Sequence, residues 1–138
     1  HLWPPNHAMV AVRIKPRVTD SCGSAGGAIP PTGFARSSQP DNAKGDGNTV
    51  GDVMGHDAYT IPVPIPGGSI AMNPDGTWTA TVELRAERSG NGECRLYTIT
   101  LAAADASGNP AAPATATISV PLDQGHACHN PACDGCRP

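Results

Sequence analysis

The chain has 138 residues, a formal net charge of −3 and charged side chains at only 15% of its positions. It has no basic patch, which argues against a nucleic-acid partner, and no run of about 20 apolar residues, which argues against insertion into a membrane. Glycine (16) and proline (15) are abundant, while aromatic residues make up 4%. This composition predicts one all-β domain with many turns and a thin core, which favours added staples such as disulfides or a metal.

Apolar and polar residues alternate with the period of a β-strand in several segments. The expected strands, in chain order, are 8–19, 34–38, 58–66, 77–86, 94–104 and 114–122. A polar loop at 39–57 is too long for a hairpin turn, and the prolines of 58–66 make that segment an edge strand or a polyproline-like run. No segment predicts a helix. We therefore expect an immunoglobulin-like antiparallel β-sandwich of about six or seven strands.

The alternation also indicates which side chains fill the core. The expected inward residues are Val10, Val12 and Ile14; Trp78, Ala80, Val82 and Leu84; Tyr97, Ile99 and Leu101; and Ala114, Ala116, Ile118 and Val120. From Asp123 onward the composition shifts towards glycine, histidine and cysteine. The sequence thus predicts a sandwich domain at 1–122 and an irregular Cys/His-rich tail at 123–138.

Four short motifs are spread along the predicted sandwich domain. They are Leu2-Trp3-Pro4-Pro5-Asn6-His7, Gly45-Asp46-Gly47-Asn48-Thr49, Leu84-Arg85-Ala86-Glu87-Arg88-Ser89-Gly90 and Asp105-Ala106-Ser107-Gly108-Asn109. Together they resemble bacterial secreted immunoglobulin-like domains, related in style to hyalin-repeat (HYR) modules, over residues 2–122. The resemblance implies a non-catalytic module that is secreted or displayed at the bacterial cell surface. Its implied partners are other domains or copies of the same protein.

Acidic and amide side chains gather in the Gly-rich part of the long loop. They are Asp41, Asp46, Asn48 and Asp52. Oxygen ligands on a flexible backbone suit calcium, although the spacing is not that of an EF-hand, because Val50 stands where that motif needs a further ligand. The alternative interpretation is a solvated acidic loop. Asp20 and Asp105, at strand ends, would complete a calcium site if the loops converge at one pole, and Glu87 is a further candidate ligand.

The five cysteines leave the disulfide pattern open. A bond between Cys22 and Cys94 would join strand ends of a small exported domain, and the alternative is two separate thiols. The tail concentrates His126, Cys128, His129, Cys133 and Cys136, which are ligand types that zinc and soft metals prefer. The other interpretation of the tail is one local disulfide among its three cysteines. The cysteine left over would then bond to another chain, to Cys22 or to Cys94.

The segment before the first strand has two interpretations. In the first, Trp3 and the following prolines form a latch over one end of the core, with Asn6 and His7 hydrogen-bonded to a neighbouring loop. In the second, His1 at a true chain start and His7 hold copper, as in the histidine brace of polysaccharide oxidases. Glu87, which stands between Arg85 and Arg88, is expected to be a salt-bridged surface or corner residue.

Three functions are compatible with these features, and none of the common catalytic motifs is present. The first is a non-catalytic structural or adhesion module, a subunit of a surface assembly or filament, stabilised by calcium and disulfides. The second is a carbohydrate-binding module of an exported enzyme, which needs exposed aromatic side chains to stack on a glycan. We expect most of the five aromatics to be buried: Trp3, Phe34, Tyr59, Trp78 and Tyr97. The third is a metal-binding or redox protein that uses the tail or His1.

Overall fold

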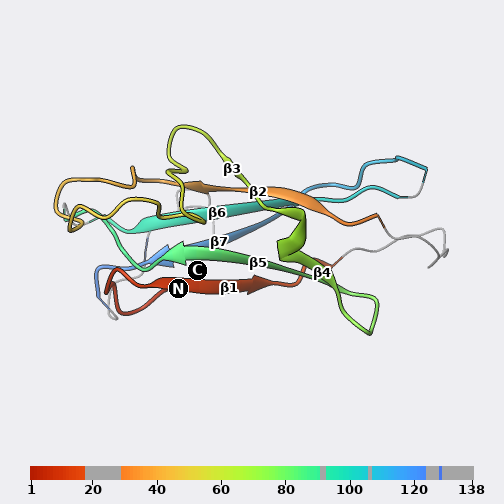
Figure 1. The fold of residues 1–138 in the computed structure, drawn as a ribbon, viewed down its shortest axis with the longest axis horizontal. Coiled ribbons are helices and arrows are strands. Elements are labelled where there is room, and N and C mark those ends of the chain that lie inside the picture. The colour runs from red at the N-terminus through yellow and green to blue at the C-terminus, as the bar shows by residue number, and fades with distance from the viewer. Residues whose placement is uncertain (18–28, 91–92, 106, 124–127, 129–138) are drawn as a thin grey trace, which may run out of the picture.

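The computed structural model describes residues 1–17, 29–90, 93–105, 107–123 and 128. Within these residues the chain forms two antiparallel sheets that face each other as a sandwich, which confirms the expected all-β class (Figure 1). The described part contains no α-helix, only a three-residue 3₁₀ turn at Gly67–Ser69 (η1). The long loop at 39–57 lies at one end of the sandwich.

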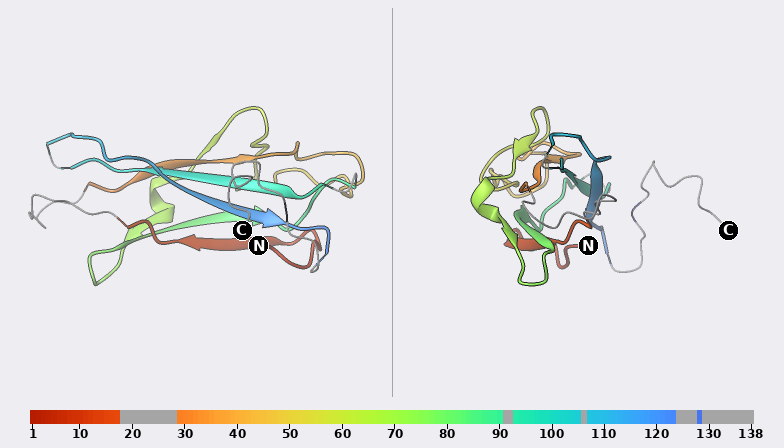
Figure 2. Two further views of the ribbon diagram at one scale, coloured as in Figure 1. Left: turned by 180° about the vertical axis from the view of Figure 1, so that it is seen from behind. Right: turned by 90° about the vertical axis from the view of Figure 1, so that its right-hand side faces the viewer.

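The two sheets contain seven strands in the described ranges. The three-stranded sheet has the order β1-β5-β4, with β1 at Met9–Ile14, β5 at Trp78–Arg85 and β4 at Ile70–Met72. The four-stranded sheet has the order β3-β2-β6-β7, with β3 at Val63–Pro64, β2 at Thr32–Ser37, β6 at Arg95–Ala102 and β7 at Ala114–Val120. In the end-on view of Figure 2, β7 lies on the opposite side of the sandwich from the segment with β3, η1 and β4.

The central strands β5 and β6 supply most of the core because each has neighbours on both sides. Val82, Leu84 and Tyr97 are fully buried, and Ile99 nearly so. The expected inward faces of β5 and β6 are confirmed. The inward residues of β1 are half-buried and pack against this core.

Three details of the predicted strands differ in the structure. The inward face of β7 is complete only at Val120: Ile118 and Ala116 are half-buried and Ala114 is exposed, because β7 lies at a sheet edge. β4 was not predicted, because three residues are too few to show an alternating pattern. The segment 58–66 does contain an edge strand, but Val63–Pro64 alone forms it.

The first residues of the chain attach to β7, at one edge of the four-stranded sheet. Leu2 is buried in the core, and its N–H donates to the carbonyl of Ser119 in β7 at 2.8 Å. Trp3 is 37% exposed. The latch expected from Trp3 is therefore provided by the neighbouring leucine.

A disulfide joins Cys94, directly before β6, to Cys128 beyond β7, with 5.6 Å between their Cα atoms. The expected bond between Cys22 and Cys94 is therefore wrong, because Cys94 has another partner. Cys22 lies outside the described residues. A bond that includes Cys128 within the tail is excluded for the same reason, and the open alternative of a tail cysteine bonded to Cys94 is confirmed.

The disulfide closes a loop of 34 positions around the β6–β7 hairpin. The chain-entropy treatment gives a bond of this span a stabilisation of about 3–4 kcal/mol. We expect Cys94→Ala/Cys128→Ala to lower the free energy of unfolding by up to this amount, measured by urea denaturation. Dithiothreitol should destabilise the wild type and leave the double variant unchanged; equal sensitivity of both proteins would place the important disulfide elsewhere.

Candidate functional site

Arg95 occupies the first position of β6 and points into the space between the sheets. Its side chain has no solvent exposure. The alternation of a strand places it on the same face as Tyr97, Ile99 and Leu101, which are all buried. A guanidinium in this position needs both charge partners and hydrogen-bond acceptors, because a buried unpaired charge costs several kcal/mol.

The partners of Arg95 come from the long loop and from its own strand. The guanidinium forms an ion pair through Nη1 with the Asp52 carboxylate. It donates through Nη2 to the carbonyl of Pro40 at 2.9 Å and through Nη1 to the Tyr97 hydroxyl at 3.2 Å. The Nε donates to Gln39 Oε1 at 3.4 Å. All three donor nitrogens of the side chain are thus used, as expected for a stable buried arginine.

Asp52 links Arg95 to a second arginine. Arg85, at the end of β5, donates through Nε to Asp52 Oδ1 at 3.1 Å. The other two nitrogens of Arg85 donate to the carbonyls of His7 and Val50 at 2.9 and 3.0 Å. The backbone N–H of Arg85 also donates to the Asp52 carbonyl at 2.8 Å. Asp52 therefore fixes the long loop against β5 through both its side chain and its backbone.

Glu87 joins three separate segments. Its side chain is fully buried and accepts hydrogen bonds through Oε2 from the Thr49 hydroxyl and from His7 Nδ1, the latter at 2.9 Å. Burial raises the pKa of the Glu87 carboxyl, and the hydrogen bond from His7 partly opposes this increase. The sequence predicted a salt-bridged surface or corner residue; the ion pair with His7 is present, but the surface position is wrong.

Asp46 brings a third carboxylate to the same arginine. Asp46 Oδ2 lies 3.9 Å from Arg95 Nη2, and Glu87 Oε1 lies 3.9 Å from Arg95 Nη1. Both oxygens are buried and accept no hydrogen bond from the described residues. Three carboxylates thus face two guanidinium groups, so a proton on Glu87 would reduce the excess of negative charge. We call Asp46, Asp52, Arg85, Glu87, Arg95 and Tyr97 the Arg95 network.

Tyr97 connects the Arg95 network to the opposite sheet. Its hydroxyl donates to the carbonyl of Arg85, the last residue of β5, at 2.8 Å. Burial raises the pKa of the Tyr97 phenol, so the group stays protonated and keeps this donor. The hydroxyl therefore joins β6 to β5 at the end of the sandwich that contains Arg95.

Glycines let the surrounding loops approach this network closely. Gly45 has φ +86°, and a Cβ there would lie 3.0 Å from the Cα of Gly90. The N–H of Gly90 donates to the Lys44 carbonyl at 3.1 Å. The glycines of two sequence motifs therefore pack directly against each other, which requires that neither carries a side chain.

The residues of the calcium hypothesis are only partly brought together. Asp46 and Asp52 both face Arg95, but Asp41 accepts from the N–H of Gly51, and Asp46 Oδ1 accepts from the N–H of Asn48. Among the described residues, no group of three or more His, Cys, Asp or Glu has the geometry of a metal site. Calcium binding by this loop stays a prediction.

The more distant candidate ligands lie elsewhere. Asp105 follows the far end of β6 from Arg95 and accepts hydrogen bonds from Ser107 and Asn109 within its own turn. It therefore does not complete a site with the long loop. Asp20 and the tail residues His126, His129, Cys133 and Cys136 fall outside the described residues, and Cys128 is held in its disulfide.

Three of the five aromatic side chains are exposed, contrary to expectation. Trp3, Phe34 and Tyr59 are exposed, whereas Trp78 and Tyr97 are buried. A groove of about 490 Å³ also borders β3, the strand that pairs with β2 at Phe34. Its apolar lining residues are Met54, Ile61, Pro62, Val63, Pro64 and Pro66.

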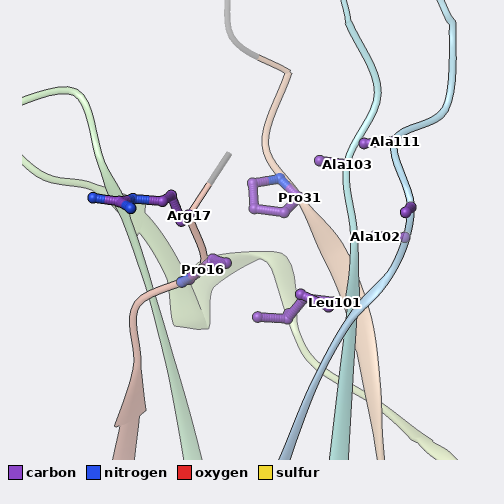
Figure 3. A pocket seen from close by; sticks show the side chains of 9 residues that line it. Pro16, Arg17, Pro31, Leu101, Ala102, Ala103 and Ala111 are labelled. Atoms are coloured by element: carbon purple, nitrogen blue, oxygen red, sulfur yellow. The ribbon is translucent and has the colours of Figure 1, made fainter. Parts of the chain in front are cut away.

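A second pocket, of about 210 Å³, lies at the end of β6 that is remote from Arg95 (Figure 3). Its wall consists of proline, alanine and Leu101, and Arg17 is its only charged lining residue. Figure 3 shows the Arg17 side chain extending away from Pro31. This pocket lacks the convergent polar groups that usually orient a ligand.

The chain matches no protein-family model, and comparison with curated proteins and with solved structures gives no significant match. In the described ranges, no helix has the length and apolar character needed to cross a membrane. The role of the candidate site is therefore inferred from its geometry. Sequence reasoning missed Arg95 and Tyr97 as members of the Arg95 network and Gln39 as a hydrogen-bond partner of Arg95, although Arg95 falls on the inward side of its strand.

Replacement of Arg95 should destabilise the fold, because the buried carboxylates would lose their positively charged partner. We expect Arg95→Met to destabilise the fold by about 3–5 kcal/mol, because Asp52 loses its main buried partner. In urea denaturation, Arg95→Met/Asp52→Asn should lose less stability than the sum of the two single changes. The exposed Arg36 provides a matched control, whose change to Met should stay within about 0.5 kcal/mol. If the effects of the two single changes on the free energy of unfolding simply add, Arg95 and Asp52 are not coupled.

The raised pKa of Glu87 predicts a pH-dependent loss of stability. The folded carboxyl retains its proton above its ordinary pKa of 4.5. Its contribution to stability is therefore full below pH 4.5 and is lost as pH rises through the folded pKa. We expect Glu87→Gln to become progressively more stable relative to the wild type as pH increases from 4.5, as measured by urea midpoints.

Asp75 gives the control for this pH experiment. A hydrogen bond from Thr77 lowers the pKa of the Asp75 carboxyl below its ordinary 3.8, so its contribution is lost only as pH falls. The curves of Asp75→Asn and the wild type should be parallel above pH 4.5. Parallel curves for Glu87→Gln as well would show that Glu87 has no raised pKa.

Proposed function

We propose that this chain is a non-catalytic, immunoglobulin-like module of a secreted or cell-surface bacterial protein, with a structural or adhesive role. The observation that carries this proposal is the role of the buried charged side chains in the candidate site. Arg95, Asp52 and Glu87 are buried and bind one another, the long loop and the N-terminal segment. They are therefore arranged to hold loops together and have no open side toward a substrate.

The strand order supports the immunoglobulin-like assignment. The order β1-β5-β4 corresponds to strands B, E and D of an immunoglobulin domain, and β3-β2-β6-β7 corresponds to C′, C, F and G. Tyr97 lies near the start of the strand equivalent to F, and its hydroxyl donates to backbone upstream. A tyrosine corner has a similar position and also bonds to backbone upstream, although over a shorter distance in the sequence than the 12 positions between Tyr97 and Arg85. Both features agree with the family that the sequence motifs resemble.

The disulfide supports a location outside the cytoplasm. Disulfides persist in oxidising compartments and at cell surfaces, and small exported domains use them to reinforce thin cores. The bond between Cys94 and Cys128 holds the last two strands of this domain. Other domains of the same parent protein, or copies of it, are the partners that fit a module of this kind.

A carbohydrate-binding module is the second candidate. The exposure of Trp3, Phe34 and Tyr59 favours it, because exposed aromatic side chains are what a glycan stacks on. The three residues come from three different parts of the chain: the N-terminal segment, β2 and the loop before β3. The structural role has the broader support, because the polar network and the disulfide both reinforce the fold itself.

Surface labelling of the source bacterium tests the proposed location. We expect antibodies raised against the folded chain to label intact cells or to detect the protein in the medium. Treatment of intact cells with a protease should remove the cell-bound signal, while a cytoplasmic marker protein is retained as the control. A signal that appears only after lysis would overturn the proposal.

Native mass spectrometry of the unreduced protein tests the non-catalytic role. An unmetallated chain, or one that carries calcium, supports the structural module. Stoichiometric copper or zinc would instead favour the metal-binding alternative with His1, His7 or the tail. If the spectrum shows calcium, the variant Asp46→Asn tests whether the long loop binds it. Asp46 Oδ2 is a buried carboxylate oxygen of that loop and accepts no hydrogen bond from the described residues.

A further inference from the structure

We propose that the free edge of β7 pairs antiparallel with β7 of a second copy of this chain, so that two four-stranded sheets join into one. This inference rests on the proposed structural function and names its partner and its contact surface. The edge is seven residues long, Ala114–Val120, and contains neither proline nor a charged side chain. Such an edge offers a row of backbone donors and acceptors to an added strand.

The hydrogen bonds show which backbone groups of β7 face outward. Ser119 lies opposite Leu96 in β6, and the Leu96 carbonyl accepts from Ser38 on the other side of that strand. The Ser119 carbonyl instead accepts from Leu2, outside the sheet. Because the backbone of a strand alternates with period two, the N–H and C=O groups of Thr117 and Thr115 face outward as well.

Leu2 already demonstrates that this edge accepts a backbone donor. It occupies only the Ser119 position, and no other described residue donates to or accepts from the outward groups of Thr115 and Thr117. Four backbone groups along the middle of β7 are thus open in the described part of the chain. An added strand would satisfy all four.

The other sheet edges are poorer docking sites for a strand. β3 has two residues and one of them is Pro64, while β4 has three residues. β1 is longer but includes Arg13, a charge of the kind that discourages strand pairing at exposed edges. Among the edges of the described sheets, the long uncharged one is therefore that of β7, which lies on one side of the sandwich in the end-on view of Figure 2.

The sequence of β7 is complementary to itself in the antiparallel direction. If Thr117 lies opposite Thr115 of the second copy, and Thr115 opposite its Thr117, the four outward groups of each strand form four hydrogen bonds. Ala116 then faces Ala116 of the second copy, and a methyl group allows the close approach of that pair. On the core side, the half-buried Ile118 would cover the exposed Ala114 of the second copy.

The outer face of this pairing is also free of conflict. Thr115 and Thr117 are both exposed on the outside of the sheet, and threonine pairs across strands are favourable. No like charges meet, since β7 is uncharged throughout. Self-pairing of β7 therefore meets the backbone, packing and charge requirements of an added strand.

A charge-swap experiment tests both the partner and the register. One variant carries Thr115→Lys/Thr117→Lys and the other Thr115→Glu/Thr117→Glu, so that each places like charges opposite each other in its own dimer. Full-length protein is used without reductant, with free thiols blocked by N-ethylmaleimide to prevent intermolecular disulfides. Sedimentation velocity over a range of concentrations reports association, and circular dichroism reports folding.

We expect the wild type to dimerise and each variant alone to associate at least roughly tenfold more weakly. An equimolar mixture of the two variants should recover the dimer. Thr32→Lys/Ala71→Lys adds the same charge at exposed positions of β2 and β4 and should dimerise as the wild type does. A wild type that remains monomeric, or variants that dimerise unchanged, would overturn β7 pairing, while the proposed surface location is decided separately by cell labelling.

Discussion

The buried guanidinium of Arg95 is the constraint on which the rest of this structure depends. It lies between two sheets with no exposed surface, beside the carboxylates of Asp52, Asp46 and Glu87. An isolated charge in this position would be too costly, so the long loop must deliver Asp52 and the Pro40 carbonyl to it. The loop thereby acquires a defined path, although it has few apolar residues of its own to bury.

The same requirement organises the other segments at this end of the sandwich. Arg85 shares Asp52 with Arg95 and reaches the carbonyl of His7, while Glu87 receives hydrogen bonds from His7 and Thr49. Three of the motifs that stand far apart in the sequence, those that contain His7, Thr49 and Glu87, therefore meet in one polar cluster.

The sequence was informative where a pattern repeats over a whole strand and uninformative where a contact depends on distant segments. The inward faces of β5 and β6 follow from alternation, and Arg95 lies on the inward side of β6 as well. The burial of Glu87 depends on Thr49 and His7, which no local pattern joins to it. The pairing of Cys94 with Cys128 depends on β6 and β7 being neighbours, and β4 is too short to show a period.

The order of the strands has a consequence for how the chain reaches this structure. Val12 in β1 pairs with Val82 in β5, 70 positions later, and Ala35 in β2 pairs with Ile99 in β6, 64 positions later. Contacts of this separation slow folding, because long loops must close before any pairing is gained. At the usual rates of synthesis, β1 waits roughly 4 to 14 s for its partner to be made. The alternating apolar side chains of β1 stay without their partner strand during that interval.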